Sequence, residues 1–434
     1  MTTPTNTFAR DVYIVDGART PFLKMKSTPG PFSASDLAVQ AGRELLKRQP
    51  FLPSDLSEVV LGCVMPSVYE ANIGRVVALR LGCGQAMPAW TVQRNCASGM
   101  QALDSAAKDI GMGRADLVLA GGAEAMSRAP LIMSDAFTEW FMRMMSAKTW
   151  KAKLQNLIHF RPAFLKPASA LIGGLTDPIV NLTMGQTAEN LAHRFHIMRE
   201  QMDQFALESH ELTASGQDEK YFAKEIVPIF DNNGQFYLAD DGVRRDSSME
   251  KLSALKPIFD KKFGQVTAGN SSQITDGAAL LILASKDAVD KYHLPMLARI
   301  VDVEWAGVDP AEMGLGPVYA TAKLLQRQHL EMSEIDYWEI NEAFAAQVLA
   351  CIAAWESDDY CRQYLGLKHA VGKLDRSKLN VDGGAVALGH PVGASGARIV
   401  LHLAEVLQRQ HAKKGIATIC IGGGQGGAML IETV

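Results

Sequence analysis

The feature that most constrains this chain is a faint internal repeat, in which the same order of elements occurs twice. In the first half, an Ala-Ser-Gly triplet at 97–99 opens a helix, and the strand that follows ends on the glycines at 121–122. In the second half, the same triplet at 394–396 opens a helix, and the strand that follows ends on the glycines at 422–423. We interpret the repeat as two similar halves of one fold. The alternative is a chance likeness between two ordinary helix–strand units.

Hydrophobic periodicity predicts an α/β protein. Short apolar runs typical of buried strands alternate with amphipathic stretches of helical length. The expected strands lie at 12–15, 59–61, 117–120, 280–283, 337–340 and 416–421, and the expected helices at 35–48, 99–112 and 397–409. We predict one half at 1–126 together with 275–294, the other at 295–434, and a loop domain inserted at 127–274.

Composition excludes several classes of function. The net charge is −4, so no overall basic field indicates a nucleic-acid partner. The six cysteines form no C-x-x-C pair and the histidines do not cluster, so we expect free thiols in a reducing compartment and no metal site. No signal peptide and no run of roughly 18 apolar residues is evident. We therefore expect a cytoplasmic protein, or a mitochondrial-matrix protein in a eukaryote, although no clear transit peptide is visible.

One segment of the loop domain, at 140–176, has an unusual charge pattern. It carries six basic residues and no acidic one, interleaved with Phe, Met, Trp and Leu. A basic amphipathic segment of this kind lies on an anionic membrane surface or on a partner helix. The alternative is a lid that packs on the body of the protein and exposes a solvated basic face.

Cys96 is the first candidate for chemistry. It follows a strand-like stretch at 91–93 and a tight turn, and a helix is expected to begin at the cysteine. The unpaired N–H groups and the positive end of the helix dipole favour a thiolate, which predicts a lowered pKa and a nucleophile. The alternative is a small buried apolar side chain.

Two glycine-rich stretches carry further candidates. His390 lies in a loop at 383–396 whose glycines indicate sharp turns and close approach of the backbone to a ligand. Its imidazole can take the proton of a thiol, or it is a structural loop histidine. Cys420 ends a strand and precedes Gly422, so it can serve as a second acid or base beside N–H groups that point at an oxyanion. A G-x-G-x-x-G match begins at Gly422, but too few residues follow for a dinucleotide fold.

Two polar stretches complete the set. Asn341 follows a predicted strand and can hold a water or donate to an oxyanion, while Glu342 can orient a base. The alternative for this pair is a helix cap. The small polar residues at 267–279 allow a thin ligand arm to lie against the backbone, or they form a polar turn before a strand.

Taken together and in this order, the five motifs resemble the thiolase family. The blocks at 121–127, 184–190 and 313–317 are also similar to thiolase blocks, and the likeness runs from about residue 12 to the C-terminus. The resemblance implies a five-layer αβαβα sandwich of two similar halves with an inserted loop domain, assembled as a homodimer or homotetramer. It also implies coenzyme A and acyl-CoA as substrates, with no bound cofactor.

The resemblance implies a role for each reactive side chain. Cys96 matches the nucleophile that accepts the acyl group, and His390 matches the base that activates it. Cys420 matches the second cysteine, which handles the proton on the acetyl-CoA carbanion. The implied reaction cleaves 3-oxoacyl-CoA with CoA to acetyl-CoA and a shortened acyl-CoA, and its reverse condenses two acetyl-CoA molecules.

Other positions match binding groups of the family. Asn341 matches the residue that fixes a water, which polarises the thioester oxygen together with the base. The backbone N–H groups of Cys96 and Gly422 match the second oxyanion hole. Ser272 matches a contact to the pantetheine arm, and Met313 matches a pocket residue beside the acyl group.

The chain departs from the family pattern at two positions. Some short-chain thiolases have histidine where this chain has Thr183. The insertions at 131–182 and 355–378 are similar to those of the trifunctional-enzyme beta subunit, whose members usually carry histidine at the position of Asn341. The acyl chain length is therefore open, and the likeness also suggests a partner within a fatty-acid oxidation complex.

Four other functions compete with a thiolase. A decarboxylating ketoacyl synthase needs a second active-site histidine, and the motif around Cys420 argues against it. A 3-hydroxy-3-methylglutaryl-CoA synthase has less support. A non-catalytic scaffold of an oxidation complex is disfavoured by the intact reactive set, and a lipid carrier rests on the segment 140–176 alone.

Overall fold

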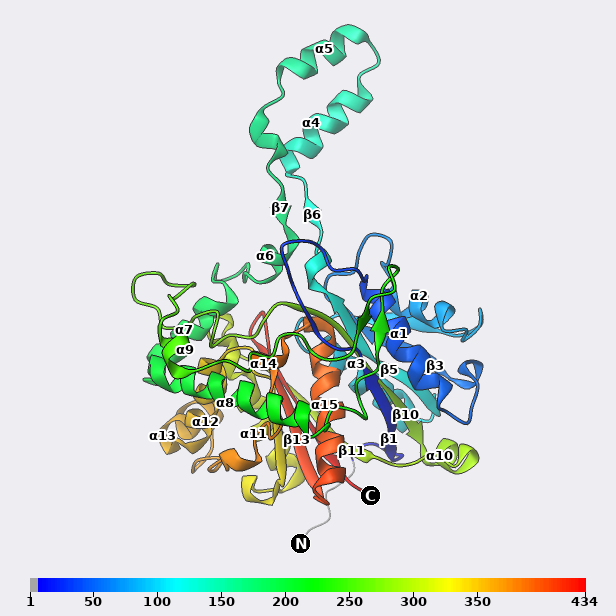
Figure 1. Ribbon diagram of the computed structural model, residues 1–434, viewed down its shortest axis with the longest axis vertical. Coiled ribbons are helices and arrows are strands. Elements are labelled where there is room, and N and C mark those ends of the chain that lie inside the picture. Colours follow the sequence, from blue (N-terminus) through cyan, green and yellow to red (C-terminus); the bar gives the residue numbers. More distant parts are fainter. Residues whose placement is uncertain (1–6) are drawn as a thin grey trace.

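The computed structural model describes residues 7–434 and is built around one large mixed sheet (Figure 1). Its strands run in the order β12-β13-β14-β11-β1-β10-β5-β3-β4, and the short β2 (Leu23–Lys24) pairs with β10. The strands are β1 (Val12–Arg19), β3 (Glu58–Gly62), β4 (Ala89–Val92), β5 (Leu117–Ala125), β10 (Thr275–Ser285), β11 (Ala298–Gly307), β12 (Tyr337–Ile340), β13 (Lys414–Ile421) and β14 (Gln425–Glu432).

The two halves predicted from the repeat have the same local topology. In the first, α3 (Ser98–Gly111) leads to β5, which pairs antiparallel with β10; in the second, α15 (Val392–Arg409) leads to β13, which pairs antiparallel with β14. The halves are joined because β1 pairs antiparallel with both β10 and β11.

The glycine clusters of the two halves differ in structure. In the second half they form the tight turn between β13 and β14, which also excludes a dinucleotide motif there. In the first half the prediction that the strand ends at the glycines is wrong, since β5 continues through them to Ala125. A Cβ on Gly122 would lie 2.0 Å from the carbonyl oxygen of Gly393. Glycine is therefore needed where the start of α15 crosses the strand.

The layers follow from the alternation of side chains along the strands. In β10, Leu280 and Ile282 pack toward α1 (Ala34–Lys47) and α2 (Ile73–Arg80), while Leu281 and Leu283 face α3 and α15. In β13, Ile419 faces the same two helices, while Ile416 packs toward α11 (Gly316–Gln328) and α12 (Ala345–Glu356). The order is helices, strands, α3 with α15, strands, helices, which is the expected five-layer αβαβα sandwich.

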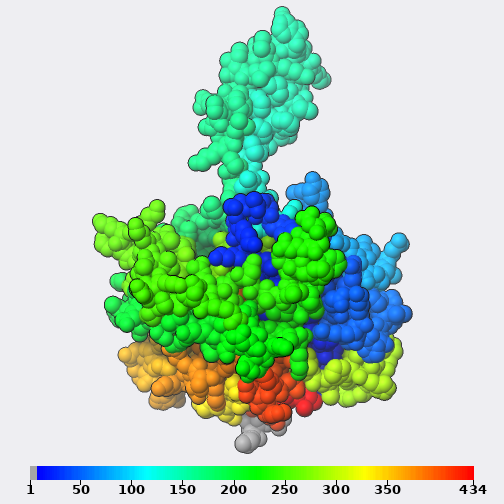
Figure 2. Space-filling view, viewed as in Figure 1, coloured from blue at the N-terminus to red at the C-terminus, as the bar shows by residue number. Residues whose placement is uncertain are grey.

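The region between β5 and β10 covers one side of this sandwich and extends beyond it. It includes α6 (Ala170–Gly174), α7 (Met184–Arg194), α8 (Arg199–Asp218), β8 (Ile229–Phe230), β9 (Phe236–Tyr237) and α9 (Met249–Ser253). Two further helices, α4 (Asp135–Ser146) and α5 (Trp150–Ile158), form an arm that projects from the body on the strands β6 (Leu131–Ile132) and β7 (Ala168–Ser169), as Figures 1 and 2 show. The arm contains no buried residue, so it is not a lid packed on the body.

Within residues 7–434, the remaining α-helices are α10 (Lys286–Tyr292), α13 (Asp358–Tyr360) and α14 (Ala385–Leu388). Within residues 7–434, no helix is both long and apolar enough to cross a bilayer.

Candidate active site

The reactive side chains predicted from the sequence share one cavity. It has a volume of ≈ 620 Å³ and lies where the loop domain meets both halves. Its lining includes Cys96, His390 and Cys420, together with the predicted binding residues Ser272 and Met313. Most of the remaining wall is apolar, as in small-molecule sites generally. Three side chains from the two halves therefore meet in one pocket, although Cys96 and Cys420 are more than three hundred residues apart in the sequence.

Cys96 lies in a tight turn between β4 and α3. The turn is closed by hydrogen bonds from the N–H of Ala97 to the carbonyl of Arg94 (3.0 Å) and from the N–H of Ser98 to the carbonyl of Asn95 (3.0 Å). The helix begins at Ser98 rather than at the cysteine. Asn95 has a φ of +43°, a left-handed conformation that Asn tolerates better than most residues. This turn presents the sulfur to the cavity.

The expected lowering of the Cys96 pKa is wrong. Burial raises the pKa of the thiol, and the N–H groups of Gly422 and of Cys96 itself, which hydrogen-bond to the sulfur, only partly offset that effect. Burial also raises the pKa of Cys420 well above its ordinary value, and the nearby Cys96 and Cys351 raise it further. Both cysteines are therefore thiols in the resting site.

His390 is held in a single orientation. Its ring Nδ1 lies 2.6 Å from Oγ of Ser395, and that hydroxyl donates to the carbonyl of Pro391 at 3.1 Å. Because the hydroxyl has one proton and gives it to the carbonyl, we assign the ring proton to Nδ1. Burial, and then the charge of Arg398, lower the pKa of His390 to about 3. The ring is neutral, and Nε2 is free to accept a proton.

Asn341 lies beside this base. Its Nδ2 is 3.5 Å from Nε2 of His390, which is a long contact for a hydrogen bond. Its backbone N–H donates to the carbonyl of Thr418 at 3.0 Å, which fixes the residue against β13. The side chain is fully buried, yet its Oδ1 has no hydrogen-bond partner within residues 7–434. The structure places Asn341 beside His390 and not as a helix cap, because α12 begins four residues later.

The turn between β13 and β14 brings Gly422 to Cys96. The side-chain amide of Asn95 donates to the carbonyl of Gly422 at 2.7 Å, and Arg94 donates to the side chain of Gln425 at 3.0 Å. The Arg94 guanidinium also stacks 4.3 Å from the ring centre of Trp305. These contacts tie the cysteine turn of one half to the glycine turn of the other.

The two predicted binding residues come from different sides. The backbone N–H of Ser272 donates to the carbonyl of Ala343 at 3.0 Å, which extends the motif at 267–279 alongside the segment after Asn341. Met313 is buried in the short 3-10 helix Pro310–Leu315, directly before α11, and contributes its side chain to the cavity. Thr183 also lines the cavity, but its hydroxyl caps α7 by accepting from the N–H of Gln186.

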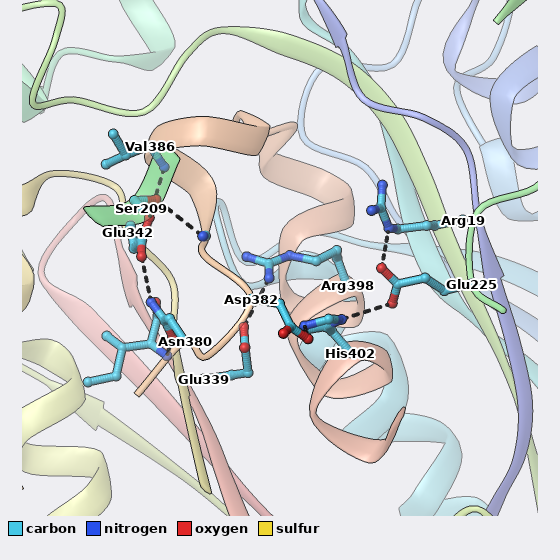
Figure 3. Close-up of polar contacts among 12 residues, drawn as sticks. Arg19, Ser209, Glu225, Glu339, Glu342, Asn380, Asp382, Val386, Arg398 and His402 are labelled. Atoms are coloured by element: carbon cyan, nitrogen blue, oxygen red, sulfur yellow. Dashed lines mark hydrogen bonds and ion pairs between the residues drawn. The ribbon is translucent and has the colours of Figure 1, made fainter. Parts of the chain in front are cut away.

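Glu342 does not orient the base, contrary to our expectation. Its buried carboxylate accepts hydrogen bonds from Ser209 (2.7 Å), Asn380 (2.7 Å) and the N–H of Val386 (3.1 Å), as Figure 3 shows. It therefore holds the loop that leads to His390 instead of touching the ring. Ser395, and not Glu342, contacts the imidazole ring of His390.

Sequence reasoning missed two other residues. Glu124, at the end of β5, is fully buried and accepts from the N–H groups of Val64, Met65 and Gly393, which joins the two halves next to the cavity. Burial raises its pKa to about 7 despite these three donors. Asn95 was read only as part of a turn. A local signal existed for it, since Asn favours the left-handed conformation.

A buried network of charges lies along α15 (Figure 3). Arg398 pairs with Glu339 at 3.0 Å, and His402 lies between Glu225 (3.3 Å) and Asp382 (3.1 Å). Glu225 also pairs with Arg19 at 3.0 Å. The network links β1, the loop domain and α15, the helix that follows His390.

A neutral thiol, a neutral imidazole and a second thiol in one apolar cavity define an enzyme that transfers acyl groups through a cysteine. Comparison with known proteins gives its family. The model of the thiolase N-terminal domain matches residues 12–287, and that of the thiolase C-terminal domain matches residues 294–433. The chain therefore belongs to the thiolase family of acyltransferases.

Individual relatives resemble the chain along its length. It is 38% identical to the mitochondrial trifunctional enzyme subunit beta of Bos taurus, over 98% of this chain and 88% of the relative. It is also 38% identical to a probable acetyl-CoA acetyltransferase of Escherichia coli, over 98% and 99%. The structure of human mitochondrial 3-ketoacyl-CoA thiolase in complex with CoA superposes with a TM-score of 0.84 at 36% identity, covering all of both chains.

Proposed function

We propose that the protein is an acetyl-CoA C-acyltransferase, which cleaves 3-oxoacyl-CoA with CoA through an acyl group on Cys96. The observation that carries this proposal is the shared cavity, into which Cys96, His390 and Cys420 all open. A single nucleophile with one base would serve many acyl transfers. A second thiol beside the first supplies the proton that carbon–carbon cleavage needs.

The first half-reaction begins with a proton transfer. Cys96 gives its thiol proton to Nε2 of His390, and the sulfur attacks the 3-keto carbon of the substrate. The N–H groups of Cys96 and Gly422, which already bond to the sulfur, lie where an oxyanion on the attacked carbon forms. The bond between C2 and C3 then breaks, the acyl group stays on Cys96, and Cys420 donates a proton to the departing enolate of acetyl-CoA.

Stabilisation of that enolate falls to Asn341 and His390. The thioester oxygen gains negative charge as the carbon–carbon bond breaks. The buried and unpartnered Oδ1 of Asn341 suits a water that donates to it, and such a water beside His390 can also donate to the thioester oxygen. In the second half-reaction, the thiol of CoA gives its proton to the Cys420 thiolate and attacks the acyl group. The bond between that group and the Cys96 sulfur breaks, and the released sulfur takes back its proton from His390.

The cavity also fits the shape and charge of an acyl-CoA. The apolar wall that includes Met313 accommodates the acyl chain, and the narrow stretch at Ser272 accommodates the pantetheine arm. Three cations, Lys24, Lys26 and Arg244, belong to the lining and can pair with the phosphates. We infer substrate binding from this complementarity, with CoA as a substrate and not as a bound cofactor.

Mass spectrometry after brief exposure to acetoacetyl-CoA tests the proposal. We expect an acetyl adduct on Cys96, and none in a Cys96→Ala variant. An adduct on another residue, or no adduct in the intact protein, would rule the assignment out. A Cys420→Ala variant should acylate Cys96 from acetyl-CoA at a near-normal rate but cleave the carbon–carbon bond slowly. Equal loss of both reactions would contradict a proton-donor role for Cys420.

Chain length and direction require a separate measurement. Thr183 lines the cavity, Asn341 lies beside the cavity residue His390, and each of the two differs from the pattern of one thiolase group. Thiolysis rates measured with substrates from four to sixteen carbons decide between acetyl transfer and long-chain degradation. The ≈ 620 Å³ cavity and its apolar wall favour a place in fatty-acid β-oxidation.

The remaining proposals concern assembly and location. Strand β4 ends the sheet with an unpaired edge, and Trp90 on it is 37% exposed. We infer a homodimer, or a homotetramer of dimers, that pairs along this edge. Light scattering on the purified protein tests this inference.

We also propose that the protein is cytoplasmic and has a partner in fatty-acid oxidation. The segment 140–176 is the proposed contact surface for a membrane or for that partner.

A further inference from the structure

We propose that the arm at 131–169 binds the surface of an anionic lipid bilayer and holds the mouth of the catalytic cavity toward it. This inference commits the contact surface of the preceding subsection to one occupant. It rests on the arm and not on the thiolase chemistry.

The arm is a self-contained hairpin of two helices. Trp140 stacks edge-on against Phe160 with ring centres 4.9 Å apart, and Phe137 lies 5.7 Å from Trp140. The indole N–H of Trp140 donates to the carbonyl of Asn156 at 2.9 Å, and the Asn156 amide donates to the carbonyl of Arg143 at 3.2 Å. These contacts fix α4 against α5. The rest of each helix surface therefore needs no partner for the hairpin to form.

That outer surface is apolar to a degree unusual for a solvated helix. Trp150 is 71% exposed and Ile158 is 76% exposed. The large apolar side chains of the two helices that are more than half exposed are Met142, Met145, Trp150, Leu154, Leu157 and Ile158. Exposed apolar surface of this extent marks an interaction site.

The pattern along α5 is that of a helix lying in a membrane interface. Trp150, Leu154, Leu157 and Ile158 fall at positions i, i+4, i+7 and i+8, which spans an arc of about 100° at 3.6 residues per turn. Lys151 and Lys153 fall just outside the two edges of this arc. Lysines in those places reach the headgroups while the apolar face enters the bilayer.

The charge of the arm selects anionic lipid. Residues 131–169 contain six Lys or Arg and two Asp or Glu, a net charge of +4, whereas the whole chain has a net charge of −4. The body is therefore acidic and is repelled by the surface that attracts the arm. A second copy presents the same basic arm, and a partner helix would need an acidic groove matched to both helices. An anionic bilayer needs no such match.

The base of the arm is part of the cavity wall. The strand β7 leads directly into α6, and Ile172 of α6 lines the cavity together with Leu175 and Thr176. Gly174 lies beside Met65 of the loop that follows β3, where Val68 and Tyr69 are also strongly exposed. Because α6 lies at the base of the arm (Figure 1), an arm bound to a bilayer places the cavity rim near the lipid, and not the far side of the sandwich.

Co-sedimentation of the full-length protein with vesicles tests the inference. One set of vesicles is phosphatidylcholine, and the other contains phosphatidylcholine with phosphatidylglycerol. We expect binding to the second set, and a loss of about tenfold or more in Lys148→Glu/Lys151→Glu/Lys153→Glu, since each cation near an anionic surface is worth about 1 kcal/mol. Trp150→Ser/Leu154→Ser/Ile158→Ser should lose binding as well. All six side chains are exposed, so the folded body is retained.

Matched controls lie elsewhere on the surface. Lys261→Glu/Lys368→Glu/Lys373→Glu makes the same change in net charge, and Phe236→Ser/Leu238→Ser removes exposed apolar side chains outside the arm. Both should bind as the unmodified protein does. Binding that is equal for the two vesicle sets, absent, or reduced as much by the controls overturns the inference, as does arm-dependent self-association on light scattering. Acetoacetyl-CoA thiolysis in the same samples should be unchanged, so a failure here is separate from a failure of the catalytic assignment.

Discussion

The side-chain amide of Asn95 donates a hydrogen bond of 2.7 Å to the carbonyl oxygen of Gly422, a residue of the other half of the fold. Asn95 directly precedes Cys96, and the N–H of Gly422 bonds to the Cys96 sulfur. The two contacts form a closed link, in which the position of the Gly422 donor depends on the residue before the nucleophile. We therefore propose Asn95 as a positioning residue for the N–H groups of Cys96 and Gly422, the proposed oxyanion donors.

Two substitutions separate the amide of Asn95 from its backbone conformation. Asn95→Ala loses the hydrogen bond and places alanine at a φ of +43°, which costs about 1 kcal/mol of stability. Asn95→Gly loses the same bond without that strain. We expect kcat for acetoacetyl-CoA thiolysis to fall about fivefold in both variants, because one hydrogen bond is worth about 1 kcal/mol. Only the alanine variant should also melt earlier. A glycine variant with normal kcat would show that Asn95 is merely structural.

Much of the fold could be predicted because its signals are local. The repeated helix–strand order predicted the two halves, and residues at the ends of strands and helix starts converge in an α/β fold. Cys96, His390 and Cys420 all follow such signals. The internal end of β5 was misplaced because the need for glycine at Gly122 comes from α15, which lies far along the chain.

The parts that could not be predicted depend on burial and on distant partners. The helix start beside Cys96 indicated a lowered pKa, but desolvation by residues from both halves outweighs the local donors. Glu342 was chosen as the residue to orient the base because it is next to Asn341, yet its carboxylate faces Ser209 and Asn380. Ser395 was visible in the helix start five residues after His390. Only the folded loop shows its hydroxyl against the ring.

The raised pKa of Cys96 predicts how the free enzyme reacts with alkylating agents. Iodoacetamide attacks the thiolate, so the rate of labelling should rise with pH and have its midpoint above that of free cysteine, about 8.5. His390, whose pKa is about 3, does not protonate near neutral pH and cannot hold an imidazolium–thiolate pair in the resting site. Mass spectrometry of peptides containing Cys96 follows the labelling. A midpoint of the labelling rate below pH 7 would contradict a resting site in which the Cys96 thiol and the His390 imidazole are both neutral.

Removal of the Ser395 hydroxyl should impair the base without impairing substrate binding. In Ser395→Ala, the Nδ1–H of His390 loses its acceptor at 2.6 Å, and both the tautomer and the ring orientation become less well defined. We expect kcat to fall about tenfold or more while KM for acetoacetyl-CoA stays near normal, as for a group that acts mainly in the transition state. Iodoacetamide labelling of Cys96 at high pH should be unchanged, since that reaction needs no base. A rise in KM alone, with normal kcat, would contradict this role.

The buried network around His402 should make the stability of the protein fall at alkaline pH. Burial alone would lower the pKa of His402, but Glu225 and Asp382 outweigh burial and raise it to about 10. Its ordinary value is about 6.5, so the stabilisation is fully present below that pH and is lost as the pH rises toward 10. Glu225 behaves in the opposite sense, because Arg19 and His402 lower its pKa to about 2 in spite of burial, and its contribution is lost only in acid.

Urea unfolding of the intact protein at pH 6, 8 and 10 should therefore show that the free energy of unfolding falls as the pH rises. In His402→Gln the fall should be smaller, from a starting stability reduced by about 3–5 kcal/mol, which is typical of a broken buried pair. The exposed His369, changed to Gln, should leave the pH dependence as it is, and parallel curves for His402→Gln and the unmodified protein would show that His402 is not charged in the fold.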